Sequence, residues 1–363
     1  MKILILGNSH LGLYKFRKEL LQRLVKDGHE VYFSIPDGEF VPQLKELGCI
    51  FLDTPMERRG TNPFKDMDLI RTYSFYLKEI RPDIVFTYTI KPNVYGGIAC
   101  QKEKIPYVAN ITGLGSAVEN GGILQLITTF LYRKGLKKVQ KAFFQNEANL
   151  EFMKERKIVK DNYDLLPGSG VNLEQYQIAE YPKKETVDFV YVGRMMSEKG
   201  FGLYLDAAET IKKKYPDTVF HICGPYEDDY KERVDRLTEK DVVVYHGLVE
   251  DMAEIYKDIH CTIHPTYYPE GMSNVLLESL ASARPIITTD RPGCKEIVDD
   301  GINGFMVKQK NLEDLIEKIE KFLNLSFEER KRLGLNGREK VEKKFSRQIV
   351  IDKYLQEIDR VKK

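Results

Sequence analysis

The chain has 363 residues, which is long for one domain and predicts two domains of roughly 150–200 residues each. Of these residues 42% are hydrophobic and 31% are charged, as in a globular protein, and the net charge of +1 argues against a general nucleic-acid-binding protein. The five cysteines are scattered, so we expect neither a disulfide framework nor a zinc site. No apolar run approaches the roughly 20 residues of a membrane span, and we expect a cytoplasmic protein.

The first half of the chain alternates short apolar strands with helices, at the spacing of parallel βαβ units. The apolar run KILIL leads into a glycine loop at residues 7–12, and a helix is expected from about residue 13 to 26. Further strands are expected at residues 31–34, 50–52, 84–88, 107–111 and 163–166, and helices at 40–46, 63–80 and from about 93. We therefore predict an α/β, doubly wound, Rossmann-like domain over residues 1–172.

Residues 123–141 (ILQLITTFLYRKGLKKVQK) combine an apolar first half with a second half that is rich in lysine and arginine. One interpretation is a helix that faces the core and has a solvated basic face. The other is a helix on a membrane surface, whose basic face meets anionic lipid. The sequence leaves both interpretations open.

After the polar stretch 179–186, which is typical of a linker, the alternation restarts with a strand, a glycine loop and a helix at 188–192, 193–200 and 201–215. Further strands are expected at residues 218–223, 242–246, 259–264, 286–289 and 305–307. These elements predict a second Rossmann-like domain over residues 173–345. The amphipathic segment 346–363 is expected to form a helix that returns to the first domain.

Two acids flank a predicted helix start in the second domain. Glu270 lies in a loop, and Glu278 lies about one turn inside the helix that follows. Between them, backbone N–H groups at the helix N-terminus make a natural seat for phosphate, contributed by Gly271, Met272, Ser273 and Asn274. Each carboxylate would then meet sugar hydroxyls on one side of that phosphate.

Two long cations lie in the glycine loop after the first strand of the second domain. Arg194 would give a forked contact to a diphosphate, and Lys199 would give a point charge. In doubly wound sheets, ligands bind beyond the carboxyl ends of the strands. Two domains that face each other would form a cleft there, with Gly12 on one side and His264, at a strand end, on the other.

Three motifs of the second half make the chain recognisable: GRMMSEKG, EGMSNVLLE and SARPIITTDRPGCKEIVDDGINGFMV. They resemble the retaining glycosyltransferases of family 4, which have the GT-B fold of two Rossmann-like domains. In the first half YKFR, YTIKPNVYG and TGLGS resemble the bacterial branch that makes surface polysaccharides and lipid-linked oligosaccharides. That branch includes N-acetylgalactosaminyl transferases acting on lipid-diphosphate-linked sugars.

The resemblance implies roles that match the reading of the residues. Arg194 and Lys199 would hold the donor diphosphate, Glu270 would reach the donor sugar, and Glu278 would bind the ribose hydroxyls. The phosphate would be met by Gly271, Met272, Ser273 and Asn274, with Val275 beside them. Gly247 and Leu248 would line the uracil pocket. No cofactor or metal ion is expected, and the D-x-D sequence at residues 66–68 is interpreted as a helix start.

The first domain departs from the family at one position. Many members carry a histidine in the loop after the fifth strand, where this chain has Thr112. His10 in the first glycine loop is an alternative source of histidine chemistry. Lys91 and Arg17 are candidates to bind the diphosphate of the acceptor.

The resemblance, together with these residues, implies transfer of a hexose or N-acetylhexosamine from a UDP-sugar to a polyprenyl-diphosphate-linked sugar. We expect a front-face reaction with retention of configuration and without a metal ion, with Glu270 as a nucleophile as the alternative. The enzyme would be peripheral on the inner face of the plasma membrane, where an anionic surface is a further partner. The alternatives are a UDP-sugar epimerase of the same fold and a non-catalytic nucleotide-sugar-binding assembly partner.

Overall fold

The computed structural model describes residues 1–57, 63–119 and 121–362. The contacts divide the chain into two compact units. The first comprises Met1–Ser169, Glu270–Met272 and Arg347–Lys363, and the second comprises Gly170–Pro269 and Ser273–Ser346. Lys363, the last residue of the predicted C-terminal helix, lies outside the described residues.

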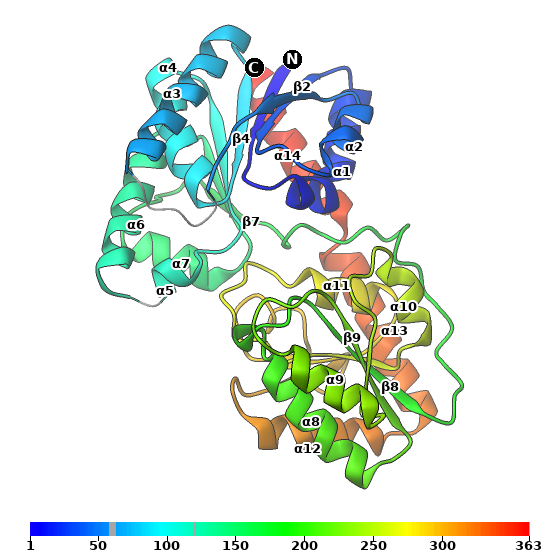
Figure 1. Cartoon of the computed structure of the whole chain (residues 1–363). Helices are drawn as coiled ribbons and strands as arrows, with labels where there is room; N and C mark the ends of the chain where they lie inside the picture. Colours follow the sequence, from blue (N-terminus) through cyan, green and yellow to red (C-terminus); the bar gives the residue numbers. More distant parts are fainter. Residues whose placement is uncertain (58–62, 120, 363) are drawn as a thin grey trace. The chain divides into compact units, whose positions relative to one another are not determined.

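The described part of the first unit contains a seven-stranded parallel sheet in the order β3-β2-β1-β4-β5-β6-β7 (Figure 1). Its strands are β1 (Lys2–Leu6), β2 (Glu30–Ile35), β3 (Ile50–Asp53), β4 (Ile84–Tyr88), β5 (Tyr107–Ile111), β6 (Lys141–Phe144) and β7 (Tyr163–Leu165). The central strands are near-continuous apolar runs, because helices cover both faces of a parallel sheet. In β1, for example, Ile3, Leu4 and Ile5 are all fully buried.

Helices pack on both faces of this sheet. One face is covered by α3 (Pro63–Ile80), α4 (Gly97–Glu103), α6 (Gly122–Gly135) and α7 (Glu147–Glu155). The other face is covered by α1 (His10–Lys26), α2 (Val41–Glu46) and the C-terminal helix α14 (Arg347–Lys362). Two short elements complete the unit, the π-helix η1 (Pro92–Gly96) and α5 (Ser116–Glu119).

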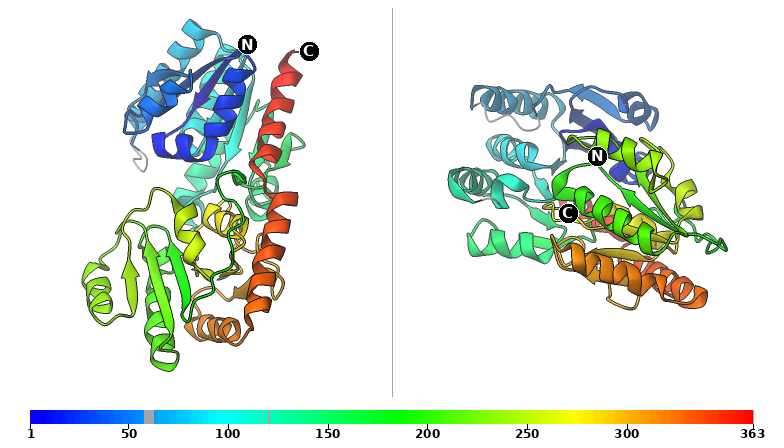
Figure 2. Two further views of the ribbon diagram at one scale, coloured as in Figure 1. Left: turned by 90° about the vertical axis from the view of Figure 1, so that its right-hand side faces the viewer. Right: turned by 60° about the horizontal axis from the view of Figure 1, so that its bottom comes forward.

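Helix α14 is part of the first unit, as the sequence predicted, and Figure 2 shows it in red. Tyr354 of this helix is fully buried, with its ring centroid 5.1 Å from that of Phe86 and 5.5 Å from that of Phe143. Its hydroxyl hydrogen-bonds to Asn110 of β5. The last helix of the chain therefore contributes to the core of the first unit.

The second unit has a six-stranded parallel sheet in its described residues, in the order β10-β9-β8-β11-β12-β13. The strands are β8 (Val187–Val192), β9 (Thr218–Cys223), β10 (Val243–Tyr245), β11 (Cys261–His264), β12 (Ile286–Thr289) and β13 (Gly304–Val307). The helices are α8 (Phe201–Lys214), α9 (Lys231–Glu239), α10 (Met252–Asp258), α11 (Asn274–Ala281), α12 (Leu312–Leu323) and α13 (Phe327–Lys344), with the 3-10 turn η2 (Ser197–Lys199). The prediction of two doubly wound α/β domains is thus confirmed.

Arg284 is the largest fully buried side chain of the protein's described residues, and it fastens the segment after residue 170 to the second sheet. Its guanidinium donates to the carbonyl oxygens of Tyr256, Glu180 and Lys257 at 2.6, 2.8 and 3.1 Å, and to that of Ala179 at 3.2 Å. Burial lowers the pKa of this arginine to about 10. The arginine of the SARP motif is therefore a structural clamp.

Two expectations differ from the structure. Helix α1 begins at His10 and not near residue 13, because Ser9 caps it by accepting a hydrogen bond from Gly12 N at 3.1 Å. Strand β6 and helix α7 were also not predicted, because no element was expected between the basic stretch that ends at residue 141 and the strand at 163–166. The strand contains only four residues, KAFF, and its pairing with β5 and β7 is what defines it.

Candidate functional site

In the second unit the strand order reverses between β8 and β11, and the loop at the carboxyl end of β8 carries both predicted cations. Gly200 ends the loop after β8 with φ of 72°, and a Cβ atom there would lie 2.1 Å from the Pro265 carbonyl oxygen. Only glycine allows the two loops to approach this closely. The Tyr191 hydroxyl donates to the Arg194 carbonyl at 2.8 Å and fixes the start of the loop.

Arg194 and Lys199 lie over the same aromatic ring. The Arg194 Cζ atom is 5.7 Å and the Lys199 Nζ atom 5.0 Å from the ring centroid of Tyr268. Arg194 also forms an ion pair with Glu227, in which the side chains are 37% and 30% exposed. The structure therefore brings the two predicted diphosphate ligands together at a partly open position, where they remain accessible to an anion.

Sequence reasoning missed the residues that organise this loop. In the structure Asp228 accepts hydrogen bonds from Ser197 N at 2.7 Å and from Ser197 Oγ at 3.0 Å. Glu227 and Asp228 follow β9, so they reach the β8 loop across neighbouring strand ends. Their position directly after a predicted strand could have identified both acids as candidate site residues.

Helix α11 starts where the phosphate seat was predicted. Ser273 is its N-cap residue and is 1% exposed. The Ser273 N–H donates to the Gly293 carbonyl at 2.9 Å, so this bond would have to break before that N–H could meet a phosphate. Among the described residues, the buried atoms Ser273 Oγ and Asn274 Oδ1 have no hydrogen-bond partner. The helix start thus presents polar groups of its own side chains as well as backbone.

The remaining predicted donor-side residues differ in exposure. Glu278 is half-buried near Tyr256, and the pKa of Tyr256 is raised first by burial and then by this carboxylate. The Val275 carbonyl accepts a hydrogen bond from the Tyr256 hydroxyl at 3.3 Å. His264, at the end of β11, is 1% exposed. In the loop after β10, Leu248 is 75% exposed, and Gly247 has φ of 70° and accepts from Gly224 N at 2.7 Å.

The segment Glu270–Met272 belongs by its contacts to the first unit. The Asn146 side-chain amide donates to the carbonyl oxygens of Glu270 and Gly271, at 3.1 and 2.7 Å. A Cβ atom on Gly271 would lie 2.3 Å from Gln145 Oε1 and 2.4 Å from the Thr112 carbonyl oxygen. Predicted residues 112 and 271 are therefore in direct contact. Gln145 and Asn146 were missed, although they follow strand β6 directly.

The first sheet reverses its strand order between β1 and β4. His10 lies after β1, with its ring stacked on Phe40 at 5.9 Å and its Nδ1 atom accepting from Phe40 N at 3.5 Å. Thr89 follows β4 with φ of 69°, which is rare for a β-branched residue. The π-helix η1 comes next. Local strain of this kind is concentrated at functional sites, so the end of β4 is a candidate for one.

Two candidate acceptor ligands are engaged with other groups in the structure. Lys91 Nζ is 2.9 Å from Asp66 Oδ1, and each side chain of this pair is 14% exposed. Asp66 also accepts from the Tyr95 hydroxyl at 2.7 Å, so the first acid of the D-x-D sequence positions η1. Arg17 is 4% exposed and its guanidinium lies 5.0 Å from the ring centroid of Tyr88. The acceptor roles of Lys91 and Arg17 remain predictions. Gly12, which was predicted to line the cleft, lies in the first turn of α1.

The described residues also bear on metal binding and membrane spanning. No group of three or more His, Cys, Asp or Glu side chains lies close enough there to hold a metal ion. Over the same residues, no helix is both long and apolar enough to cross a bilayer.

Comparisons with known proteins match both halves of the chain. Residues 2–146 match the family described as glycosyl transferase 4-like, and residues 174–340 match the glycosyl transferases group 1. The chain is 26% identical to N,N'-diacetylbacillosaminyl-diphospho-undecaprenol alpha-1,3-N-acetylgalactosaminyltransferase from Campylobacter jejuni, covering 99% of both chains. It is 27% identical to the capsular polysaccharide biosynthesis glycosyltransferase CapM from Staphylococcus aureus, covering 91% of this chain and 90% of CapM.

A solved structure gives the same fold. HepE from Anabaena, in complex with UDP and glucose, matches with a TM-score of 0.81 at 15% identity, covering 99% of this chain and 100% of HepE. The two domain matches are in the order found in the structure. The first covers strands β1 to β6 of the first sheet, and the second covers all six described strands of the second sheet. The first half of the chain is therefore a glycosyl transferase 4-like domain and the second half a group 1 glycosyl transferase domain, and together they have the GT-B fold.

Proposed function

We propose that this protein is a retaining, metal-independent glycosyltransferase of cell-surface polysaccharide assembly. It moves a hexose or N-acetylhexosamine from a UDP-sugar to a lipid-diphosphate-linked sugar at the inner face of the plasma membrane. The observation that carries the proposal is the pairing of Arg194 and Lys199 over Tyr268 at the strand reversal of the second sheet. The name of the Campylobacter relative supports the acceptor class, and the HepE complex supports UDP as the carrier.

In the proposed reaction the bond between the anomeric carbon and the diphosphate breaks, and negative charge grows on the leaving phosphate. Arg194 and Lys199 stabilise that charge, which is the step at which fixed cations have their greatest effect. The acceptor hydroxyl attacks the face that the phosphate leaves, and its proton passes to a phosphate oxygen. Glu270 holds hydroxyls of the donor sugar near the reacting carbon.

The test is to incubate the purified protein with a panel of UDP-sugars and a polyprenyl-diphosphate-linked acceptor, with and without EDTA. We expect UDP release that EDTA does not abolish, and a product whose new glycosidic bond keeps the donor's anomeric configuration in its NMR coupling constants. An absolute requirement for a divalent ion, or an inverted product, would contradict the proposal. Interconversion of the UDP-sugar without acceptor would instead identify an epimerase.

Replacement of Gly271 by alanine is expected to lower kcat/KM by about 10²-fold, the order of loss produced by a displacement of about 1 Å in an active site. The added Cβ would meet the Thr112 carbonyl at 2.4 Å, so the backbone beside Glu270 must move. Steady-state kinetics at fixed acceptor measure this loss. The control is Gly202→Ala in α8, where the nearest atom is the Tyr230 hydroxyl at 3.2 Å. Equal activity of both variants would show that the position of Glu270 is not critical.

A further inference from the structure

Helix α6 (Gly122–Gly135) places its polar side chains inside and its apolar side chains outside. The buried residues include Thr128, Thr129 and Tyr132, which are 6%, 9% and 1% exposed. The large apolar side chains are between 46% and 77% exposed: Ile123, Leu124, Leu126, Ile127 and Phe130. A helix on the surface of a water-soluble domain normally has the opposite arrangement. A continuous apolar patch of this kind marks an interaction surface.

The orientation of α6 is fixed by close packing at its C-terminal end. A Cβ atom on Gly135 would lie 2.6 Å from the Cα atom of Val94. The Gly135 carbonyl accepts hydrogen bonds from the Tyr107 hydroxyl at 2.6 Å and from Gln101 Nε2 at 3.0 Å. Rotating the helix to bury its apolar side chains would break these contacts. The apolar face is therefore held outward by the fold of the first unit.

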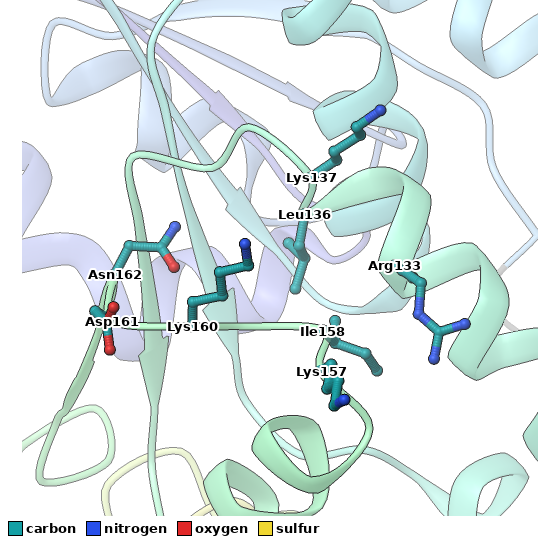
Figure 3. A pocket seen from close by; sticks show the side chains of 8 residues that line it. All are labelled: Arg133, Leu136, Lys137, Lys157, Ile158, Lys160, Asp161 and Asn162. Atoms are coloured by element: carbon teal, nitrogen blue, oxygen red, sulfur yellow. The ribbon is translucent and has the colours of Figure 1, made fainter.

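The same end of the helix borders a basic pocket of about 690 Å³. Figure 3 shows its cationic side chains, which are Arg133, Lys137, Lys157 and Lys160. Its lining also includes one acid, Asp161. Arg133 Nη2 donates to the Arg156 carbonyl at 2.9 Å, which ties the helix to the segment that carries the two later lysines. Arg133 thus joins the helix to the pocket, whose other cations follow α6 in the chain.

We propose that the outward face of α6 and this pocket, together the α6 surface, dock onto the surface of an anionic bilayer. Apolar side chains enter the boundary between headgroups and acyl chains, and clustered lysine and arginine side chains meet anionic headgroups. A partner protein that covered only the apolar residues would have no use for the adjacent cations. Docking by the α6 surface would bring the enzyme to its lipid-linked acceptor. This purpose rests on the proposed function, whereas the docking itself is argued from the residues of the surface.

The first test measures flotation of the full chain with phosphatidylcholine vesicles, with and without phosphatidylglycerol. We expect binding to the anionic vesicles at about 50 mM salt and weaker binding at about 500 mM, because salt screens the charge attraction. The double variant Leu126→Asp, Ile127→Asp is expected to lose at least about tenfold in partition coefficient. Both side chains are at least 50% exposed, so the folded state tolerates the change. The control is Ile302→Asp in the second unit, where Ile302 is 56% exposed.

The second test reverses charges in the pocket. The variant Lys137→Glu, Lys160→Glu is expected to lose about tenfold or more of its binding to anionic vesicles at low salt. The control is Lys213→Glu, Lys240→Glu, which makes the same charge change at exposed lysines of the second unit. Equal flotation of the pocket variant and its control would remove the pocket from the proposal.

A third measurement identifies a different occupant. If sedimentation shows a stable dimer that Leu126→Asp, Ile127→Asp converts to a monomer, the α6 surface contacts a second copy and the proposal is wrong. Equal flotation of the wild type with and without vesicles would also overturn it. No sugar donor or acceptor is present in these experiments, so their failure is distinct from failure of the proposed reaction. With a water-soluble acceptor analogue, the α6 variants are expected to keep wild-type kcat.

Discussion

Replacement of Lys199 by alanine is expected to lower kcat/KM for the sugar donor by about 10²–10³-fold, the cost of removing one charge-stabilising donor from an active site. Lys199 Nζ lies 5.0 Å from the ring centroid of Tyr268, which it shares with Arg194. Arg194 is already partly neutralised by its ion pair with Glu227. Lys199 therefore places a second positive charge over the same ring, beside an arginine that Glu227 partly neutralises.

Three variants make this expectation specific. Lys199→Arg keeps the charge and is expected to recover part of the activity. Lys214→Ala removes an exposed lysine that pairs with Glu320 at 2.7 Å and is expected to behave as the wild type. Glu227→Gln releases Arg194 and is expected to change KM for the donor more than it changes kcat. Full activity of Lys199→Ala would show that the diphosphate binds elsewhere.

Replacement of Arg284 by methionine is expected to destabilise the second unit by about 3–5 kcal/mol, the usual cost of breaking a buried charged network. Methionine fills much of the volume, but the carbonyl oxygens of Tyr256, Glu180 and Lys257 lose their donor inside the protein. Unfolding in urea measures the total change in free energy. Hydrogen exchange of the β11 and β12 amides reports on the second unit separately.

The control for Arg284 is Arg233→Met. Arg233 is ion-paired with Asp206 at 2.5 Å and Glu209 at 2.7 Å, and its side chain is 26% exposed. Pairs of this exposure contribute about 1 kcal/mol or less. Equal stability of the two variants would mean that the carbonyl groups around residue 284 find water or other donors. The SARP arginine would then have a role outside stability.

Much of the fold could be predicted from the sequence, because buried parallel strands are short apolar runs between turn residues. The predicted bounds of β4, β5, β9 and β12 agree with the structure. Helix α3 begins at Pro63, where proline fits the first helical turn. The predicted start of α1 was wrong by three residues, because Ser9 caps the helix inside the glycine loop.

The site was harder to predict, because its geometry depends on side chains from different strand ends. The sequence identifies Lys91 and Arg194 as cations, but only the fold shows that Asp66 and Glu227 accompany them. Periodicity likewise reveals an apolar face on α6, but it does not say whether that face or the opposite one packs against the core. The packing of Gly135 against Val94 decides that, and a local pattern carries no information about it.

The burial of Tyr354 in the first unit has a consequence for biosynthesis. The core around Phe86 and Phe143 is completed by a residue near the end of the chain. A ribosome adding 5–20 residues per second needs roughly 10–35 s to synthesise residues 170–346. During that time the nascent first unit lacks its final helix and exposes the apolar groove that α14 later fills. The first unit can therefore reach its final packing only after the whole second unit has been synthesised.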